Sequence, residues 1–130
     1  EIGIGNRNGT FHCFDGSNGR LEWNFAIGSS SSDIYSCDID GDGVAEFIFG
    51  TGDGRLISLG ANERVEWAMD FGDGVGEPIF CDLDGDLRAD ILVPVMDRNI
   101  YALHIPEQAL GPVLLGLCAL VLLRSPKRFG

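Results

Sequence analysis

The chain has 130 residues, enough for one domain, and carries 20 acidic against 9 basic residues, a formal net charge of −11. Nucleic-acid binding needs a basic face, so this charge argues against nucleic acid as a partner. The 19 glycines and the scarcity of helical periodicity predict short strands joined by tight turns.

The sequence repeats itself with a step of about 44 residues. The stretches that begin at Glu1, Glu46 and Asp90 align at offsets of 45 (46 − 1) and 44 (90 − 46), and Trp23 and Trp67 keep the step of 44 (67 − 23). Within one period the apolar runs and turn residues predict four strands. These strands are 47–50, 55–59, 64–70 and 76–83, with a hairpin turn at 51–54.

Four short strands in such a period match one blade of a β-propeller. We therefore expect an all-β fold of propeller blades, each of about 44 residues, over residues 1–104. A β-sandwich is the competing architecture, but it does not require this recurrence. Two to three blades cannot close a ring of four to eight, and Glu1 stands where Glu46 and Asp90 stand. We expect a C-terminal fragment of a larger propeller or, alternatively, several copies assembled into one ring.

An acidic loop precedes the second copy of the repeat, and its spacing suits a hard cation. Such loops place side-chain oxygens at positions 1, 3, 5 and 9 and a backbone carbonyl at position 7 around one ion. The predicted ligands are Asp38, Asp40, Asp42, the carbonyl of Val44, and Glu46. Ligands that are all oxygen favour Ca²⁺ over Zn²⁺ or copper.

A second acidic loop follows at an offset of 44 (82 − 38). Its predicted Ca²⁺ ligands are Asp82, Asp84, Asp86, Arg88 through its carbonyl, and Asp90. Leu87 replaces the glycine at position 43 of the first loop, so the second loop must turn under strain or bind its ion more weakly. The alternative is that both loops are ordinary acidic turns. Four carboxylates kept in each loop repel one another without a cation, which favours the metal sites.

The two acidic loops with their following strands, DIDGDGVAEFIFGTGDG and DLDGDLRADILVP, resemble the FG-GAP and VCBS repeats of integrin-α-like calcium-binding propellers. The stretch 13–23 resembles the tryptophan-docking motif of quinoprotein-like propellers: Asp15, Gly19 and Trp23 match it, and Cys13 and Asn18 depart from it. This second resemblance implies that the tryptophan packs between adjacent blades.

The tail, residues 105–130, leaves the repeat. Residues 109–123 are fifteen residues without a charge, followed by Arg124, Lys127 and Arg128. This is short for a spanning helix, which needs about 20 apolar residues. The order of Pro106, Glu107, an apolar run and a basic end resembles the PEP-CTERM sorting signal, with Gln108 in place of the second proline. The resemblance implies a C-terminal hydrophobic helix, export and transient anchoring in a membrane; a buried or frayed terminal helix is the alternative.

These features predict an exported, calcium-binding propeller module of the cell surface, periplasm or extracellular matrix, whose partner is an unidentified protein or polysaccharide. The alternative is the C-terminal part of a propeller enzyme, a quinoprotein dehydrogenase or a polysaccharide lyase, with its active residues in other blades. His12 and His104 share no repeat position and stand beside no nucleophile. We therefore predict that both are surface or packing residues, and we predict no catalytic residue.

Overall fold

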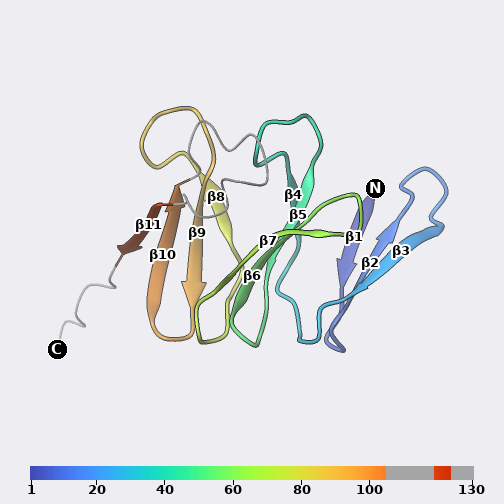
Figure 1. The fold of residues 1–130 in the computed structure, drawn as a ribbon, viewed down its shortest axis with the longest axis horizontal. Coiled ribbons are helices and arrows are strands. Elements are labelled where there is room, and N and C mark those ends of the chain that lie inside the picture. The colour runs from blue at the N-terminus through green and yellow to red at the C-terminus, as the bar shows by residue number, and fades with distance from the viewer. Residues whose placement is uncertain (105–118, 124–130) are drawn as a thin grey trace.

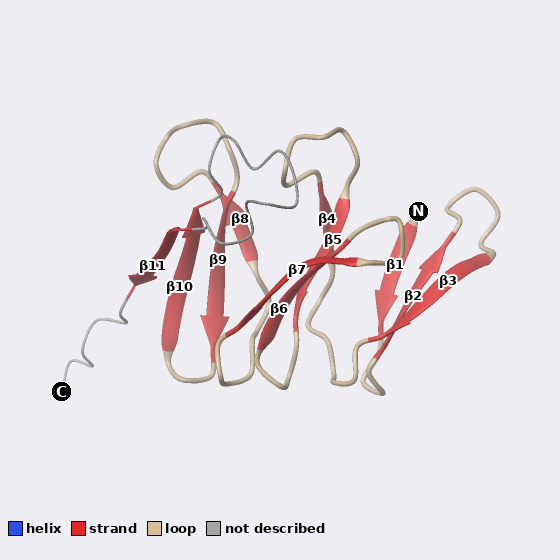
Figure 2. Ribbon diagram, viewed as in Figure 1, coloured by secondary structure: helices blue, strands red, loops and turns tan. Residues whose placement is uncertain are grey.

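The computed structural model describes residues 1–104 and the backbone of Ala119–Leu123. The regular secondary structure of these residues consists of β-strands alone, and the strands form three antiparallel sheets (Figure 2). The first sheet contains β1 (Ile2–Gly5), β2 (Thr10–Phe14) and β3 (Leu21–Ala26). The second contains β4 (Tyr35–Cys37), β5 (Glu46–Gly50), β6 (Arg55–Leu59) and β7 (Val65–Asp70). The third contains β8 (Ile79–Cys81), β9 (Asp90–Val95), β10 (Asn99–His104) and β11 (Ala119–Leu123).

Neighbouring strands in each sheet are consecutive in the sequence, and their positions follow the 44-residue step. β4 and β8 begin 44 residues apart (79 − 35), as do β5 and β9 (90 − 46) and β6 and β10 (99 − 55). β8 is shorter than the predicted strand 76–83. It ends at Cys81, because the next residue, Asp82, turns its carboxylate back onto the acidic loop.

The second sheet lies between the other two and is covered on both faces (Figure 1). All five residues of β5 are buried. Phe47 and Phe49 pack with Phe11 of the first sheet, whereas Ile48 packs with Ile91 and Val93 of the third. Both acidic loops, 38–45 and 82–89, lie at the same end of the stack, at the top of Figure 1, on neighbouring sheets.

The all-β class is confirmed, and the propeller arrangement of the sheets stays a prediction. The expected C-terminal helix spans 109–123, of which 109–118 lie outside the described residues. The last five residues of this span form strand β11 and not a helix. β11 pairs antiparallel with β10, from Ile100↔Leu123 to His104↔Ala119. An extended segment here pairs the outer N–H and C=O groups of β10, which would otherwise be an open sheet edge. Among the described residues no helix is long and apolar enough to cross a membrane.

The close approach of β5 to the segment between β7 and β8 gives a test of this packing. A Cβ on Gly50 would lie 2.5 Å from the carbonyl oxygen of Gly76 and 2.6 Å from a methyl carbon of Val75. Gly50→Ala should therefore lower the free energy of unfolding in urea by about 1–3 kcal/mol, the usual cost of overpacking. Gly16→Ala is the matched control, because its nearest atom would be 3.7 Å away. Equal stability of the two variants would contradict the packing.

Candidate metal centre

The first acidic loop joins β4 to β5 and is shaped by its first aspartate. Asp38 accepts the amide of Gly41 on Oδ1 at 2.8 Å and the amide of Gly43 on Oδ2 at 2.9 Å. Both glycines have positive φ, +79° and +88°, which lets the loop turn tightly enough for two amides to reach one carboxylate. One side chain thus fixes the curvature of the whole loop.

The remaining predicted side chains converge inside this curve. The amide of Asp42 donates to Asp40 at 3.0 Å, and the amide of Val44 donates to Asp42 at 2.7 Å. Glu46 begins β5, is 1% exposed, and accepts the amide of Ile39 at 2.9 Å. The oxygens offered by Asp38, Asp40, Asp42 and Glu46 all lie within 4.8 Å of one another. The structure therefore brings together the four predicted side-chain ligands. Val44, predicted to bind the ion through its carbonyl, donates its amide to Asp42.

Burial and mutual repulsion disfavour the ionised form of two carboxylates in this loop, those of Glu46 and Asp40. Burial raises the pKa of Glu46 from 4.5 to about 7, and the charges of Glu66, Asp40 and Asp42 add to the rise. Burial also raises the pKa of Asp40, with further repulsion from Asp42 and Asp38. A divalent cation among these oxygens would relieve both effects, because it favours the ionised carboxylates.

Glu66 is a further carboxylate whose charge acts on this loop, and it was not among the predicted site residues. It lies on β7, where a Cβ at Gly60 would be 2.5 Å from its Oε1, so its carboxylate covers Gly60. Burial, followed by the charges of Asp40 and Asp42, raises the pKa of Glu66. The sequence signal was the repeated glutamate before each tryptophan, Glu22 before Trp23 and Glu66 before Trp67.

The second loop repeats the hydrogen bonds of the first residue for residue. Asp82 accepts the amides of Gly85 at 2.7 Å and Leu87 at 2.9 Å, as Asp38 does with its two glycines. The amide of Asp86 donates to Asp84 at 3.1 Å, the amide of Arg88 to Asp86 at 2.9 Å, and the amide of Leu83 to Asp90 at 2.8 Å.

The predicted strain at Leu87 is confirmed, because this residue has φ +68° and is 93% exposed. Its conformation is one that a leucine side chain disfavours and that glycine adopts freely. The loop nevertheless keeps the curve of its counterpart. Exposure of the side chain leaves the strain in the backbone without an added clash in the core.

The second loop differs from the first at its closing carboxylate. Oxygens of Asp82, Asp84 and Asp86 lie within 4.8 Å of one another, but Asp90 gathers instead with Asp84 and His104. His104 Nδ1 lies 2.8 Å from Asp90 Oδ1 and 3.4 Å from Asp84 Oδ2. Its hydrogen bond with Asp90 raises the pKa of the imidazole, and the charges of Asp84, Asp90 and Asp86 act in the same direction. His104 is thus part of a polar cluster, and not only the surface or packing residue that we predicted.

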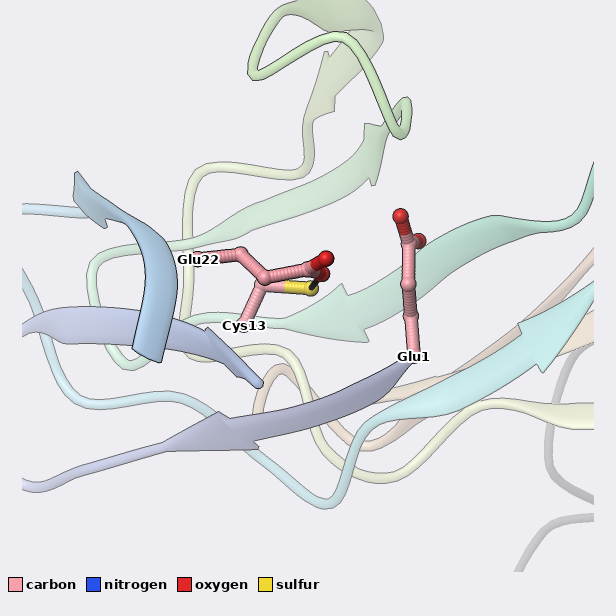
Figure 3. A group of neighbouring side chains, drawn as sticks. All are labelled: Glu1, Cys13 and Glu22. Atoms are coloured by element: carbon pink, nitrogen blue, oxygen red, sulfur yellow. Dashed lines mark hydrogen bonds between the residues drawn. The ribbon is translucent and has the colours of Figure 1, made fainter. Parts of the chain in front are cut away.

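A third group of side chains lies on the first sheet, where Figure 3 shows Cys13 and Glu22 side by side with Glu1 beyond them. Cys13 Sγ donates to Glu22 Oε2 at 3.8 Å. Burial, helped by the charges of Glu1 and Glu22, raises the pKa of the thiol to about 11. A metal needs the thiolate, which this environment disfavours. Glu1 and Glu22 of this group stand at the repeat positions of Glu46 and Glu66.

No protein-family model and no curated protein sequence matches this chain. The chemistry of the acidic loops therefore carries the functional argument. Clustered carboxylate oxygens on a fixed loop bind hard divalent cations, and a nitrogen donor beside them widens the choice of ion.

The raised pKa of Glu46 predicts how stability depends on pH when no divalent cation is present. The unfolded chain loses this proton near pH 4.5 and the folded chain near pH 7, so stability should fall as the pH rises between these values. In chelator, the melting temperature should therefore decrease from pH 5 to pH 7.5. Glu46→Gln, which keeps an acceptor for the amide of Ile39, should flatten this decrease.

The raised pKa of His104 contributes a fall in the same direction, and the comparison of the two proteins removes it because both keep His104. Parallel pH curves for the parent and Glu46→Gln would show that Glu46 does not titrate in this range.

Proposed function

We propose that this chain is a calcium-binding β-repeat module, in which the first acidic loop binds one Ca²⁺ through Asp38, Asp40, Asp42 and Glu46. The observation that carries the proposal is the convergence of these four carboxylates within 4.8 Å, with Glu46 only 1% exposed. Burying a carboxylate among like charges is costly unless it is paired. An oxygen-only set of ligands suits Ca²⁺. The role of the ion is to hold the connection between β4 and β5.

We further propose that the three sheets are blades of a larger propeller of the FG-GAP and VCBS type. Supporting this, Trp23 of the first sheet stands edge-on to Phe47 of the second, with ring centroids 6.4 Å apart, as a tryptophan docked between blades would. The sheets are also packed face to face through two separate apolar clusters. The tail, residues 105–130, serves in this proposal as a sorting and membrane segment through residues 109–123.

In this proposal the module is exported and acts at the cell surface, in the periplasm or in the extracellular matrix, where its exposed loops bind a protein or a polysaccharide. The net charge of −11 disfavours an anionic polymer as partner unless Ca²⁺ bridges the two. Affinity for Ca²⁺ is expected in the range of extracellular modules, about 10⁻⁴–10⁻³ M.

Thermal unfolding of the full chain in Ca²⁺ and in chelator tests the calcium site. Calcium that binds only the folded state raises stability by mass action, by about 2.7 kcal/mol at a hundredfold excess over Kd. Asp42→Asn keeps an acceptor for the amide of Val44 and removes one charged ligand, so it should abolish most of the rise in melting temperature.

Asp33→Asn is the control, because it removes the same charge from an exposed position outside both loops. It should respond to Ca²⁺ as the parent does. A parent protein indifferent to Ca²⁺ at 10 mM scale, or an equal response of both variants, would refute the calcium site.

A further inference from the structure

The second acidic loop and strand β10 together form a donor set that the first loop lacks. His104 is the last residue of β10, and the pairing of Leu103 with Ile91 sets it opposite Asp90, the first residue of β9. Two adjacent strands thus hold the imidazole and the closing carboxylate in register. At the same place in the second sheet, where β6 meets β5, the residue is Gly60, and it carries no donor side chain.

The carboxylate oxygens of the second loop divide into two classes. The loop's own amides bind both oxygens of Asp82, Asp84 Oδ1 and Asp90 Oδ2. Asp84 Oδ2 and Asp90 Oδ1, the other oxygens of their carboxylates, converge on one atom, His104 Nδ1, at 3.4 and 2.8 Å. The backbone of the loop therefore orients two oxygens, from residues six positions apart (90 − 84), toward a single nitrogen.

These separations fit a small ion with mixed ligands. An ion that binds nitrogen and oxygen at about 2.0–2.2 Å, as Zn²⁺ does, separates neighbouring ligand atoms by about 2.9–3.5 Å, depending on its geometry. The three donor atoms lie within 4.8 Å of one another, so only small side-chain rotations are needed to enclose it. Imidazole nitrogen favours Zn²⁺ and its neighbours in the transition series over Ca²⁺, which prefers oxygen throughout.

The three side chains of the set differ in solvent exposure, as expected for a site that an ion can enter from solvent. The side chain of Asp90 is 3% exposed, that of His104 34% and that of Asp84 49%. Asp90 is therefore fixed in the interior, while Asp84 and His104 border solvent, from which an ion can enter. Three protein donors leave a fourth position of a tetrahedral ion for water.

We propose that Asp84, Asp90 and His104 form a site for a borderline divalent transition metal of the Zn²⁺ class. The site is distinct from the calcium site of the first loop and uses none of its ligands. It assigns to the second loop an ion different from the Ca²⁺ that its carboxylate spacing predicts. The metal bridges β9, β10 and the acidic loop, so it stabilises the third sheet at the end where the loops lie.

Titration calorimetry of the full, chelator-treated chain with Zn²⁺ alone at pH 7.5 tests this site. The parent should bind one Zn²⁺ at micromolar concentration through the set. His104→Asn keeps an amide that can donate to Asp90 but removes the imidazole, and it should weaken Zn²⁺ binding at least tenfold. Asp84→Asn, at the exposed border, should weaken it similarly. His12→Asn is the matched control, because His12 is the other histidine of the chain and lies near Asn6, outside the set.

Substitution by Co²⁺ gives a second readout, because Co²⁺ held in a four-coordinate site absorbs visible light more strongly than the six-coordinate aqua ion. This stronger absorption should appear in the parent and in His12→Asn and be absent from His104→Asn. Thermal melting of each metal-free variant establishes that it is folded. If His104→Asn does not fold, the comparison of Zn²⁺ affinity uses Asp84→Asn in its place. Unchanged Zn²⁺ affinity in both His104→Asn and Asp84→Asn, or no binding by the parent at 100 μM scale, would overturn the proposal.

These experiments test the calcium and zinc proposals independently, so either one can be refuted without the other. His104→Asn should leave the rise in melting temperature with Ca²⁺ unchanged, since the first loop is intact. Asp42→Asn should leave Zn²⁺ binding unchanged. Loss of both responses in His104→Asn would overturn the assignment of His104 as a ligand for its own ion and indicate a general loss of structure.

Discussion

Each acidic loop is fastened to its sheet by one buried carboxylate, and the architecture of the candidate sites depends on this contact. Glu46 begins β5 and accepts the amide of Ile39, and Asp90 begins β9 and accepts the amide of Leu83. As whole residues, Glu46 and Asp90 are 1% and 2% exposed. A buried charge is tolerated only with donors or a counter-charge around it. Each loop must therefore curve back to present an amide, and the curve gathers the other aspartates around the same point.

The sequence predicted the parts of the fold that local spacing controls. The predicted strands 47–50, 55–59 and 64–70 differ from β5, β6 and β7 by one residue at most. Alternating aspartates and glycines predicted both loops, down to the backbone strain at Leu87, because each loop is closed by bonds between residues two to seven positions apart. Periodicity of the sequence set the step at which the strands recur, since each repeat carries its own turns.

The features that the sequence did not predict all depend on strands brought together from separate segments. Glu66 on β7 adds charge near the first loop, and His104 on β10 contacts the carboxylates of the second. Neither belongs to a loop motif. Glu66 repeats Glu22 of the preceding copy, whereas the position that corresponds to His104 in the preceding copy holds Gly60. Likewise, the resemblance of the tail to a sorting signal implied a helix over residues 109–123, whereas residues 119–123 form β11 along the edge of β10. The positions of these residues depend on strand pairing between distant segments, which residue spacing along the chain does not reveal.

Two loops with the same aspartates thus acquire different chemistry from the strand beside them. At Gly60 the missing side chain leaves room that the carboxylate of Glu66 covers, and this carboxylate adds negative charge near the first loop. At His104 the imidazole occupies the corresponding place and sets a nitrogen between two carboxylates. Oxygen ligands and more negative charge favour a larger, harder ion, and a nitrogen favours a smaller, more polarisable one. The proposed difference in metal between the loops therefore arises from one position of the neighbouring strand, and substitutions there should change the preferred ion more than substitutions within the loops.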